Sequence, residues 1–400
     1  MQKCLYKGLC PKLSTNVRKT SLPPMSIVEK KYIMIKKTDS LIIKLLRASL
    51  FKEDFLDEEV KRILPKNDKE LKEVLLSAGK QGVSAIVGKQ ILQLPKEYLN
   101  DLPQKSAFFQ MVGVVHAVQQ NYKRQYNIAS AFASALSKKG VKCIILKGIS
   151  FSTYYNDPSL RECGDCDCYL GNDCKVGDST AKDLGGQVAF GTYKHSHIFL
   201  NGLLIENHRY LTEFNNTKQG KRTELVLQEA IKRGMGKEVW GSSLICPNSH
   251  FNVLFLVKHA LDEFLAGGIT LRMLYDWAAL LRADQNKLCW TEIYANMQAC
   301  GIKRFADLMT AVCIKYFGLR KTAQELEYCN DQWLVDELIE DTLYCGMHPI
   351  PRESLTRKSL RVVKRFVRMW HYRKLASENV PTMIWNSFAF SSYLHRNIEL

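Results

Sequence analysis

The 400-residue sequence lacks any long, uninterrupted apolar run. Phe251 to Val257 is too short to cross a membrane, and charged residues interrupt the apolar stretches elsewhere. The N-terminal region also lacks the apolar core of a secretory signal, because Lys44 and Arg47 interrupt the best candidate, residues 41–51. These absences predict a cytoplasmic protein without a membrane span.

The thirteen cysteines lack the spacing of a disulfide framework. Without an export signal they are expected to be reduced thiols. A zinc site built from Cys163, Cys166, Cys168 and Cys174 is an alternative, since Cys-x2-Cys is a known ligand spacing. However, Cys166 and Cys168 alternate with two aspartates in a predicted strand and should face the core, which favours buried thiols.

Acidic residues are scarce near the two ends of the sequence. The net charge is +17, and residues 1–37 and 352–374 each contribute +8, so the rest of the chain is nearly neutral. The second basic segment carries apolar residues at helical spacing, which makes it a candidate contact for an anionic membrane or a nucleic acid. A solvated helix with one face on the protein body explains the same pattern. A peripheral position at a membrane therefore stays as an alternative to a purely cytoplasmic one.

The periodicity of apolar residues changes twice along the chain. Spacings of three and four predict helices before residue 140 and after about residue 220, whereas short apolar runs between them predict strands. His195 to Leu200 and Leu203 to Tyr210 flank Asn201-Gly202, a strong hairpin signal. The expected fold class is α+β, with a small mixed sheet between N-terminal helices and a C-terminal helical bundle. The expected divisions are a basic flexible N-terminal segment at 1–37, an N-terminal helical region at 38–140, a catalytic core at 141–220, a C-terminal helical bundle at 221–350 and a basic amphipathic segment at 351–400.

Two carboxylates stand two residues apart in a predicted strand. Strand side chains alternate, so Asp165 and Asp167 project to one face, where they repel each other unless a cation lies between them. Glu206, on the returning strand of the hairpin, provides a third carboxylate, and His208 is expected to line the same active-site face. Three carboxylates on adjacent strands could hold two divalent cations, so Mg²⁺ or Mn²⁺ is the expected cofactor.

Residues suited to phosphate binding lie nearby in the sequence. Lys147 and Gly148 stand where a strand meets a helix; the glycine lets a phosphate approach the backbone, and the lysine supplies positive charge. Arg161 could clamp a phosphate through two nitrogens, and Gly164 directly precedes the carboxylate pair. Each feature alone has a simpler explanation: a solvated strand face for the aspartates, a surface ion pair for Glu206 and an ordinary strand-end lysine. The ordered set is more specific than any of its members.

In this order the motifs resemble those of the uncharacterised nucleotidyltransferases, which have the fold of the DNA polymerase β superfamily. The matching residues are Leu146-Lys147-Gly148, Asp157-Pro158, Leu160-Arg161-Glu162-Cys163-Gly164-Asp165-Cys166-Asp167 and Ile205-Glu206-Asn207-His208. The similarity extends over roughly residues 40–345. Cys166, Cys168 and Arg209 depart from the residue types usual in the family but leave the catalytic groups intact.

The resemblance implies an enzyme that transfers a nucleoside monophosphate from an NTP to a hydroxyl acceptor by a two-metal mechanism, with release of pyrophosphate. The implied contacts are Asp165 and Asp167 with the metal ions, Glu206 as third ligand or base, and Lys147, Gly148, Arg161 and Gly164 with the nucleotide phosphates. The acceptor stays open among small molecules, sugars, proteins and RNA. Two alternatives stand beside this one: a nucleotide- or RNA-binding module of the same fold with little catalysis, and a peripheral membrane or assembly protein acting through its basic ends.

Overall fold

Residues 35–53, 56–101, 106–213, 217–234, 236–345 and 355–375 are described by the structure, which is a computed structural model. The expected N-terminal segment 1–37 lies almost wholly outside the described residues, as does the part of 351–400 beyond residue 375. From Ile35 onward the described residues belong to one unit of helices, a mixed sheet and further helices. The expected α+β fold is confirmed.

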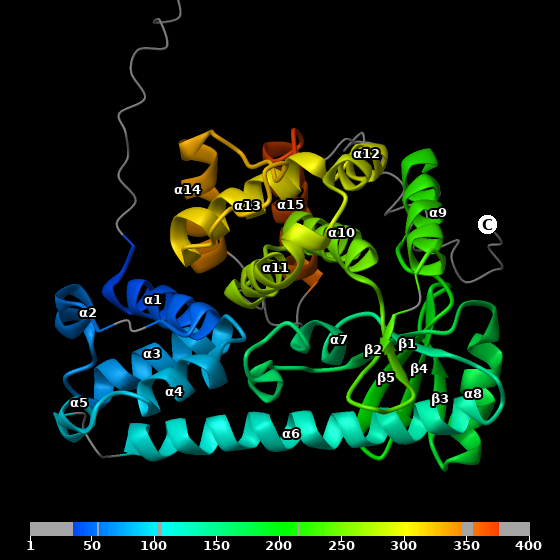
Figure 1. Cartoon of the computed structure of the whole chain (residues 1–400), viewed down its shortest axis with the longest axis horizontal. Coiled ribbons are helices and arrows are strands. Elements are labelled where there is room, and N and C mark those ends of the chain that lie inside the picture. The colour runs from blue at the N-terminus through cyan, green and yellow to red at the C-terminus, as the bar shows by residue number, and fades with distance from the viewer. Residues whose placement is uncertain are drawn as a thin grey trace, which may run out of the picture. The chain divides into compact units, whose positions relative to one another are not determined.

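Within the described residues, six helices precede the sheet. They are α1 Lys37–Phe51, α2 Glu58–Ile63, α3 Asp68–Lys80, α4 Ser84–Leu92, α5 Lys96–Asp101 and α6 Ser106–Ser137. Helix α3 begins where the side chain of Asn67 accepts a hydrogen bond from the backbone of Glu70 at 2.9 Å, as an N-cap does. The long helix α6 contacts α3 and α4 near one end and β1, β7 and α8 near the other, so it joins the helical region to the sheet (Figure 1).

Seven strands of the described residues form one mixed sheet in the order β3-β4-β5-β2-β1-β7-β6. Their bounds are β1 Cys143–Ile145, β2 Cys166–Tyr169, β3 Gln187–Phe190, β4 His195–Leu200, β5 Leu203–His208, β6 Lys237–Glu238 and β7 Leu244–Cys246. Strand β2 runs antiparallel to β1 and parallel to β5. Asn201 and Gly202 join β4 to β5 with φ of 48° and 75°, which confirms the expected hairpin and its turn.

The sheet is larger than the sequence predicts. Strand β3 was not expected, and β6 and β7 lie beyond the region to which strands were assigned. Strand β7 pairs in parallel with β1, about one hundred residues earlier. Strands of two to four residues carry too little alternation to be recognised, and a parallel partner so distant in sequence leaves no local signature.

The sheet separates the site from a small apolar core. Cys166 and Cys168 are 4% and 0% exposed and pack with Phe132 and Leu136 of α6. The alternating Asp167 therefore points to the opposite side of β2. Both thiols are buried, as their alternation with the aspartates predicts.

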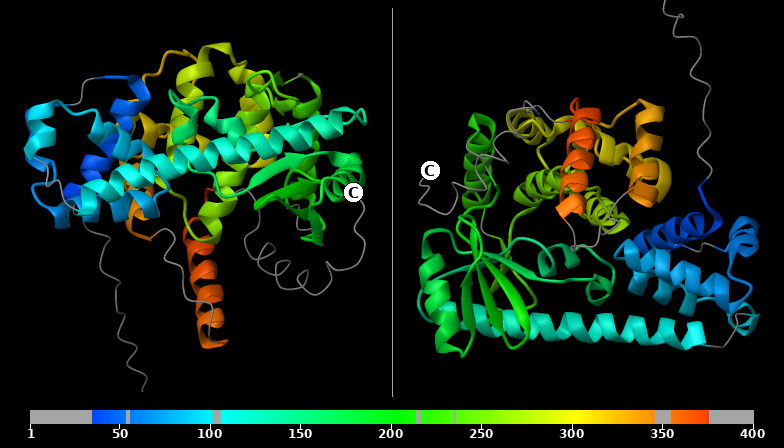
Figure 2. Two further views of the ribbon diagram at one scale, coloured as in Figure 1. Left: turned by 90° about the horizontal axis from the view of Figure 1, so that it is seen from below. Right: turned by 180° about the vertical axis from the view of Figure 1, so that it is seen from behind.

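The second, larger core is formed by the N-terminal helices together with the helices of the C-terminal bundle. Between β1 and β3 lie α7 Ile149–Ser152, the 3-10 helices Pro158–Leu160 and Gly171–Asp173, and α8 Cys174–Asp183. The C-terminal helices are α9 Lys218–Lys232, α10 Ser249–Ala266, α11 Leu271–Asp284, the 3-10 helix Gln285–Lys287, α12 Trp290–Cys300, α13 Lys303–Phe317, α14 Gln332–Glu340, the π-helix Asp341–Cys345 and α15 Leu355–His371. Helix α10 contacts α9, α11 and α15, and α11 also contacts α1 and α7. Figure 2 shows α15 projecting from the other helices. No helix in the described part of the chain is long and apolar enough to span a bilayer.

Candidate active site

A buried carboxylate lies at the centre of the site. Asp167, in β2, is 1% exposed, and its Oδ1 atom lies 2.8 Å from Nζ of Lys147. Burial disfavours ionisation of Asp167, but the charge of Lys147 and the hydrogen bond from His208 outweigh it and hold the pKa well below its usual value. Asp167 is therefore kept ionised by its neighbours.

Asp165, two residues earlier, has the opposite balance. Burial and the charge of Asp167 raise the pKa of Asp165, although Lys147 opposes this. Burial lowers the pKa of Lys147, but the charges of the two aspartates outweigh it and raise the pKa above its usual value. One ammonium group thus faces two carboxylates whose pKa values are displaced in opposite directions.

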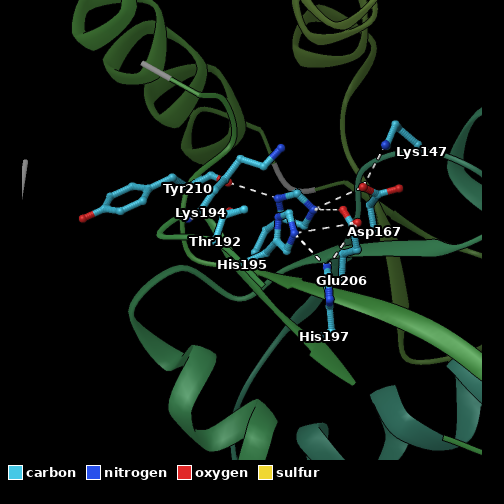
Figure 3. Close-up of polar contacts among 9 residues, drawn as sticks. Lys147, Asp167, Thr192, Lys194, His195, His197, Glu206 and Tyr210 are labelled. Carbon is cyan, nitrogen blue, oxygen red and sulfur yellow. Dashed lines mark hydrogen bonds and ion pairs between the residues drawn. The ribbon is translucent and has the colours of Figure 1, made fainter. Parts of the chain in front are cut away.

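Glu206 is surrounded by imidazoles (Figure 3). The register of the sheet places Glu206 opposite Asp167 on one side and His197 on the other, and pairs His195 with His208. Nε2 of His208 lies 3.2 Å from Oε2 of Glu206 and 3.1 Å from Oδ1 of Asp167. Nε2 of His195 and of His197 lie 3.7 and 3.8 Å from Oε1 of Glu206.

Burial and hydrogen bonding set the charges of His195 and Glu206. Burial, followed by the charge of His208, lowers the pKa of His195 to about 4. Burial opposes ionisation of Glu206, but the hydrogen bond from His208 lowers the pKa of this carboxyl below its usual value. At neutral pH, His195 is therefore a neutral imidazole beside an ionised carboxylate.

Two adjoining hollows share Lys147, Asp165 and Asp167. The small hollow, of about 450 Å³, is also lined by Gly148, Arg161 and Gly164. The large hollow, of about 1240 Å³, is also lined by Glu206 and His208. Every residue to which the sequence assigns a role in metal or nucleotide binding therefore borders at least one of the two hollows.

A family model described as an uncharacterised nucleotidyltransferase matches residues 67–318, which is more than half of the chain. The chain belongs to this nucleotidyltransferase family. Membership indicates transfer of a nucleotidyl group, and hence a transferase with a nucleotide as substrate. No curated protein and no solved structure matches the chain. The matched residues contain the whole sheet and every predicted site residue, whereas α15 lies outside them.

Gly148 of this nucleotidyltransferase has a backbone conformation that other residues rarely adopt. Its φ of 56° is in the left-handed region, which strains a side chain, although an added Cβ atom would make only an ordinary contact with the carbonyl oxygen of Asp165 at 3.5 Å. The chain passes here from β1 into α7 while Lys147 reaches towards Asp167. A side chain at Gly148 would strain the turn that positions the lysine.

Arg161 is held by a carboxylate of the helical bundle. Its Nε and Nη2 atoms donate to the two oxygens of Asp276, in α11, at 2.9 and 2.7 Å. The hydroxyl of Tyr155 donates to Oδ1 of Asp276 at 2.7 Å, and Nη1 of Arg161 contacts Sγ of Cys163 at 3.3 Å. Although Arg272 stands one helical turn before Asp276, its Nη1 donates instead to the carbonyl of Glu162 at 2.9 Å. Arg161 was expected to bind a phosphate through two nitrogens. In the structure, two of its nitrogens bind Asp276 instead.

Several residues of the nucleotidyltransferase site have no role in the sequence interpretation. His195 and His197 stand beside Glu206, and the Asn-Gly turn offered a signal, because the register it sets pairs His197 with Glu206. The large hollow is also lined by Lys194 of the β3–β4 connection, Lys258 of α10 and Arg365 of α15. No local pattern predicts the last two, since packing brings them to the sheet from distant parts of the chain.

Proposed function

We propose that this nucleotidyltransferase transfers a nucleoside monophosphate from an NTP to a hydroxyl acceptor, with release of pyrophosphate. The observation that carries the proposal is the convergence of three carboxylates, Asp165, Asp167 and Glu206, beside one lysine at the border of the two hollows. An arrangement of this kind is costly for a fold to keep unless cations and phosphates use it.

The carboxylates fit a divalent cation. Three ionised carboxylates beside one ammonium carry a formal charge of −2, and the raised pKa of Asp165 is a consequence of this crowding and of burial. Mg²⁺ and Mn²⁺ take oxygen ligands, so Asp165, Asp167 and Glu206 would hold them. When bound, such ions supply positive charge at the reacting phosphate.

The other residues would bind and orient the two substrates. Lys147, with a side chain 22% exposed, is the cation nearest the carboxylates and would contact phosphate oxygens. Nη1 of Arg161 contacts only a thiol among the described residues, so it is the guanidinium atom proposed to meet phosphate. Gly148 and Gly164 line the small hollow beside it. Glu206, ionised at neutral pH, would accept a hydrogen bond from the acceptor hydroxyl in the large hollow and help to remove its proton.

The decisive experiment measures label transfer from each α-³²P-labelled NTP, with Mg²⁺ or Mn²⁺ and a cell extract as the pool of acceptors. Asp165→Asn and Asp167→Asn should each reduce transfer by about 10³-fold or more, because each removes charge that holds the ions. The matched control is Asp183→Asn, an exposed carboxylate paired with Lys139 at the surface, which should transfer like the wild type.

Two results would count against the proposal. Undiminished transfer by both active-site variants would remove these carboxylates from the reaction. Tight binding of NTP without transfer to any acceptor would instead favour a nucleotide-binding module of the same fold.

We also propose that helix α15 contacts an anionic membrane. Its buried face includes Met369, which is 3% exposed, and Arg368, whose Nη atoms donate to both oxygens of Asp341 at 2.6 Å. Its opposite face exposes an apolar stripe at positions i, i+3, i+4 and i+7: Val363, Phe366, Val367 and Trp370, each 44–59% exposed. The helix contains six Lys or Arg and no Asp or Glu. An exposed apolar stripe within a basic helix fits the interface of anionic lipids, whereas nucleic acid would not need the stripe.

Co-sedimentation of the full chain with phosphatidylglycerol vesicles tests this contact, with phosphatidylcholine vesicles as the neutral comparison. Val367→Ser with Trp370→Ser should reduce binding to the anionic vesicles, whereas Leu225→Ser, at a residue of α9 that is 58% exposed, should not. Equal binding to both lipids would contradict the proposal. Binding to RNA that survives the double substitution would identify a nucleic-acid contact instead.

A further inference from the structure

The hairpin of β4 and β5 gathers nitrogen ligands beside the carboxylates. One ligand atom each from His195, Glu206 and His208 lies within 4.8 Å of the other two. Among the described residues, these three side chains are the set of His, Cys, Asp or Glu ligands found close enough together to hold a metal ion. Two imidazoles and a carboxylate are a different donor set from the oxygen ligands that Mg²⁺ prefers.

His208 has the hydrogen bonding of a metal ligand. Its Nδ1 atom lies 3.2 Å from the carbonyl oxygen of Tyr210, and a carbonyl can only accept, so Nδ1 carries the proton. Nε2 then faces the carboxylates of Glu206 and Asp167 at 3.2 and 3.1 Å. Metal-binding histidines commonly donate their second ring N–H to a backbone carbonyl in this way.

His195 supplies an independent observation. Its side chain is 9% exposed, and its Nδ1 atom is buried without a hydrogen-bond partner among the described residues. Its Nε2 atom lies 3.2 Å from Nε2 of His197 and 3.7 Å from Glu206. The Nε2 atoms of His195 and His197 therefore both lie near the carboxylate of Glu206. Nδ1 of the buried His195 ring makes no hydrogen bond among the described residues.

Backbone pairing holds the three ligands in place. His195 and His208 are opposite each other on β4 and β5, and Glu206 is two residues before His208 on the same face of β5. Ligands on paired strands move less than ligands on loops, so an ion would find the site largely formed.

We propose that His195, Glu206 and His208 form a site for one transition-metal ion, for which Zn²⁺ is the best fit, beside the Asp165 and Asp167 pair. Two histidines and one glutamate with further space in the large hollow match the donor set of zinc sites that keep an open position. Glu206 would then belong to both groups of ligands. The site goes beyond the proposed transfer reaction and does not depend on it.

The test is titration of the chelator-stripped full chain with Zn²⁺, Mn²⁺ or Mg²⁺ by calorimetry, without nucleotide. One equivalent of Zn²⁺ should bind at least about 10²-fold more tightly than Mg²⁺. His195→Gln and His208→Gln should each weaken Zn²⁺ binding by about 10²-fold, and Zn²⁺ should raise the melting temperature of the wild type but not of these variants. His116→Gln, on the outer surface of α6, is the matched control and should retain the site.

Cobalt substitution separates this site from adventitious binding to the thirteen cysteines. Co²⁺ bound by imidazole and carboxylate gives visible d–d bands without a thiolate charge-transfer band, and the bands should disappear in both histidine variants. A thiolate band, Zn²⁺ binding no tighter than Mg²⁺, or full binding by the histidine variants would overturn the proposal. Because binding is measured without nucleotide, failure of nucleotidyl transfer would leave this result unaffected, and loss of the zinc site would leave the transfer proposal standing.

Discussion

Two ion pairs border the same small hollow, and they differ in how their charges balance. Arg161 and Asp276 match one guanidinium with one carboxylate through two hydrogen bonds, and Tyr155 adds a third to the carboxylate. Lys147 and Asp167 form a single contact, with Asp165 and Glu206 leaving additional negative charge nearby. The first pair is complete, so it can act as a structural joint between the sheet region and α11. The second pair leaves negative charge that one lysine does not balance. A bound metal ion would balance it.

Breaking the complete pair should have the largest effect on stability. Asp276→Ala leaves Arg161 buried without its carboxylate, and we expect a loss of about 3–5 kcal/mol in the free energy of unfolding, measured by urea denaturation. The double variant Arg161→Met with Asp276→Leu removes both charges and should recover most of that loss. A double variant as unstable as Asp276→Ala would show that the pair does more than balance charge.

Breaking the incomplete pair should cost less and should depend on metal ions. Lys147→Met leaves Asp167 buried without its ammonium, so the metal-free protein should lose about 2 kcal/mol of unfolding free energy at pH 7. Mn²⁺ should restore part of this loss, because a bound ion replaces the missing charge. The Asp276→Ala variant is the control, since no ion is expected to rescue it. Equal rescue of both variants would remove the distinction between the two pairs.

The smallest expected change in the free energy of unfolding is a gain in stability, in contrast to the two losses above. The pKa of Asp165 is raised in the folded protein, so its ionisation weakens folding at pH values above the unfolded pKa of about 4. Asp165→Asn should therefore stabilise the metal-free protein by about 1 kcal/mol at pH 7 while abolishing transfer. The gain should shrink as the pH falls through the raised pKa of folded Asp165, and it should vanish below the unfolded pKa of about 4, where the side chain is protonated in both states. Thermal unfolding from pH 4 to 8 measures this, and a destabilised variant at pH 7 would contradict it.

Local sequence patterns predict the strands and the turn that carry the site residues better than they predict which distant residues contact them. The alternation of Asp165 and Asp167 with two cysteines predicts correctly that the thiols are buried, and the Asn-Gly turn correctly predicts the strand that carries Glu206. These features depend on strand geometry and on the turn alone. The roles assigned to the individual site residues stay predictions until they are measured.

Long-range packing accounts for what the sequence could not predict. The partner of Arg161, Asp276, is 115 residues away in α11. Strand β7 reaches β1 across a similar distance in the chain. Such contacts depend on how complete elements pack, and no short segment contains that information.

One side of the large hollow is lined by residues of α15, which is the last helix of the described chain. Asp165, Asp167 and Glu206 belong to the middle of the sequence, whereas Arg365 and Met369 come from α15. During synthesis on the ribosome, the carboxylates emerge well before the helix that closes their surroundings. The hollow can reach its full form only after residue 369 has been made, so a prematurely terminated chain would carry the acidic groups without the wall that encloses them.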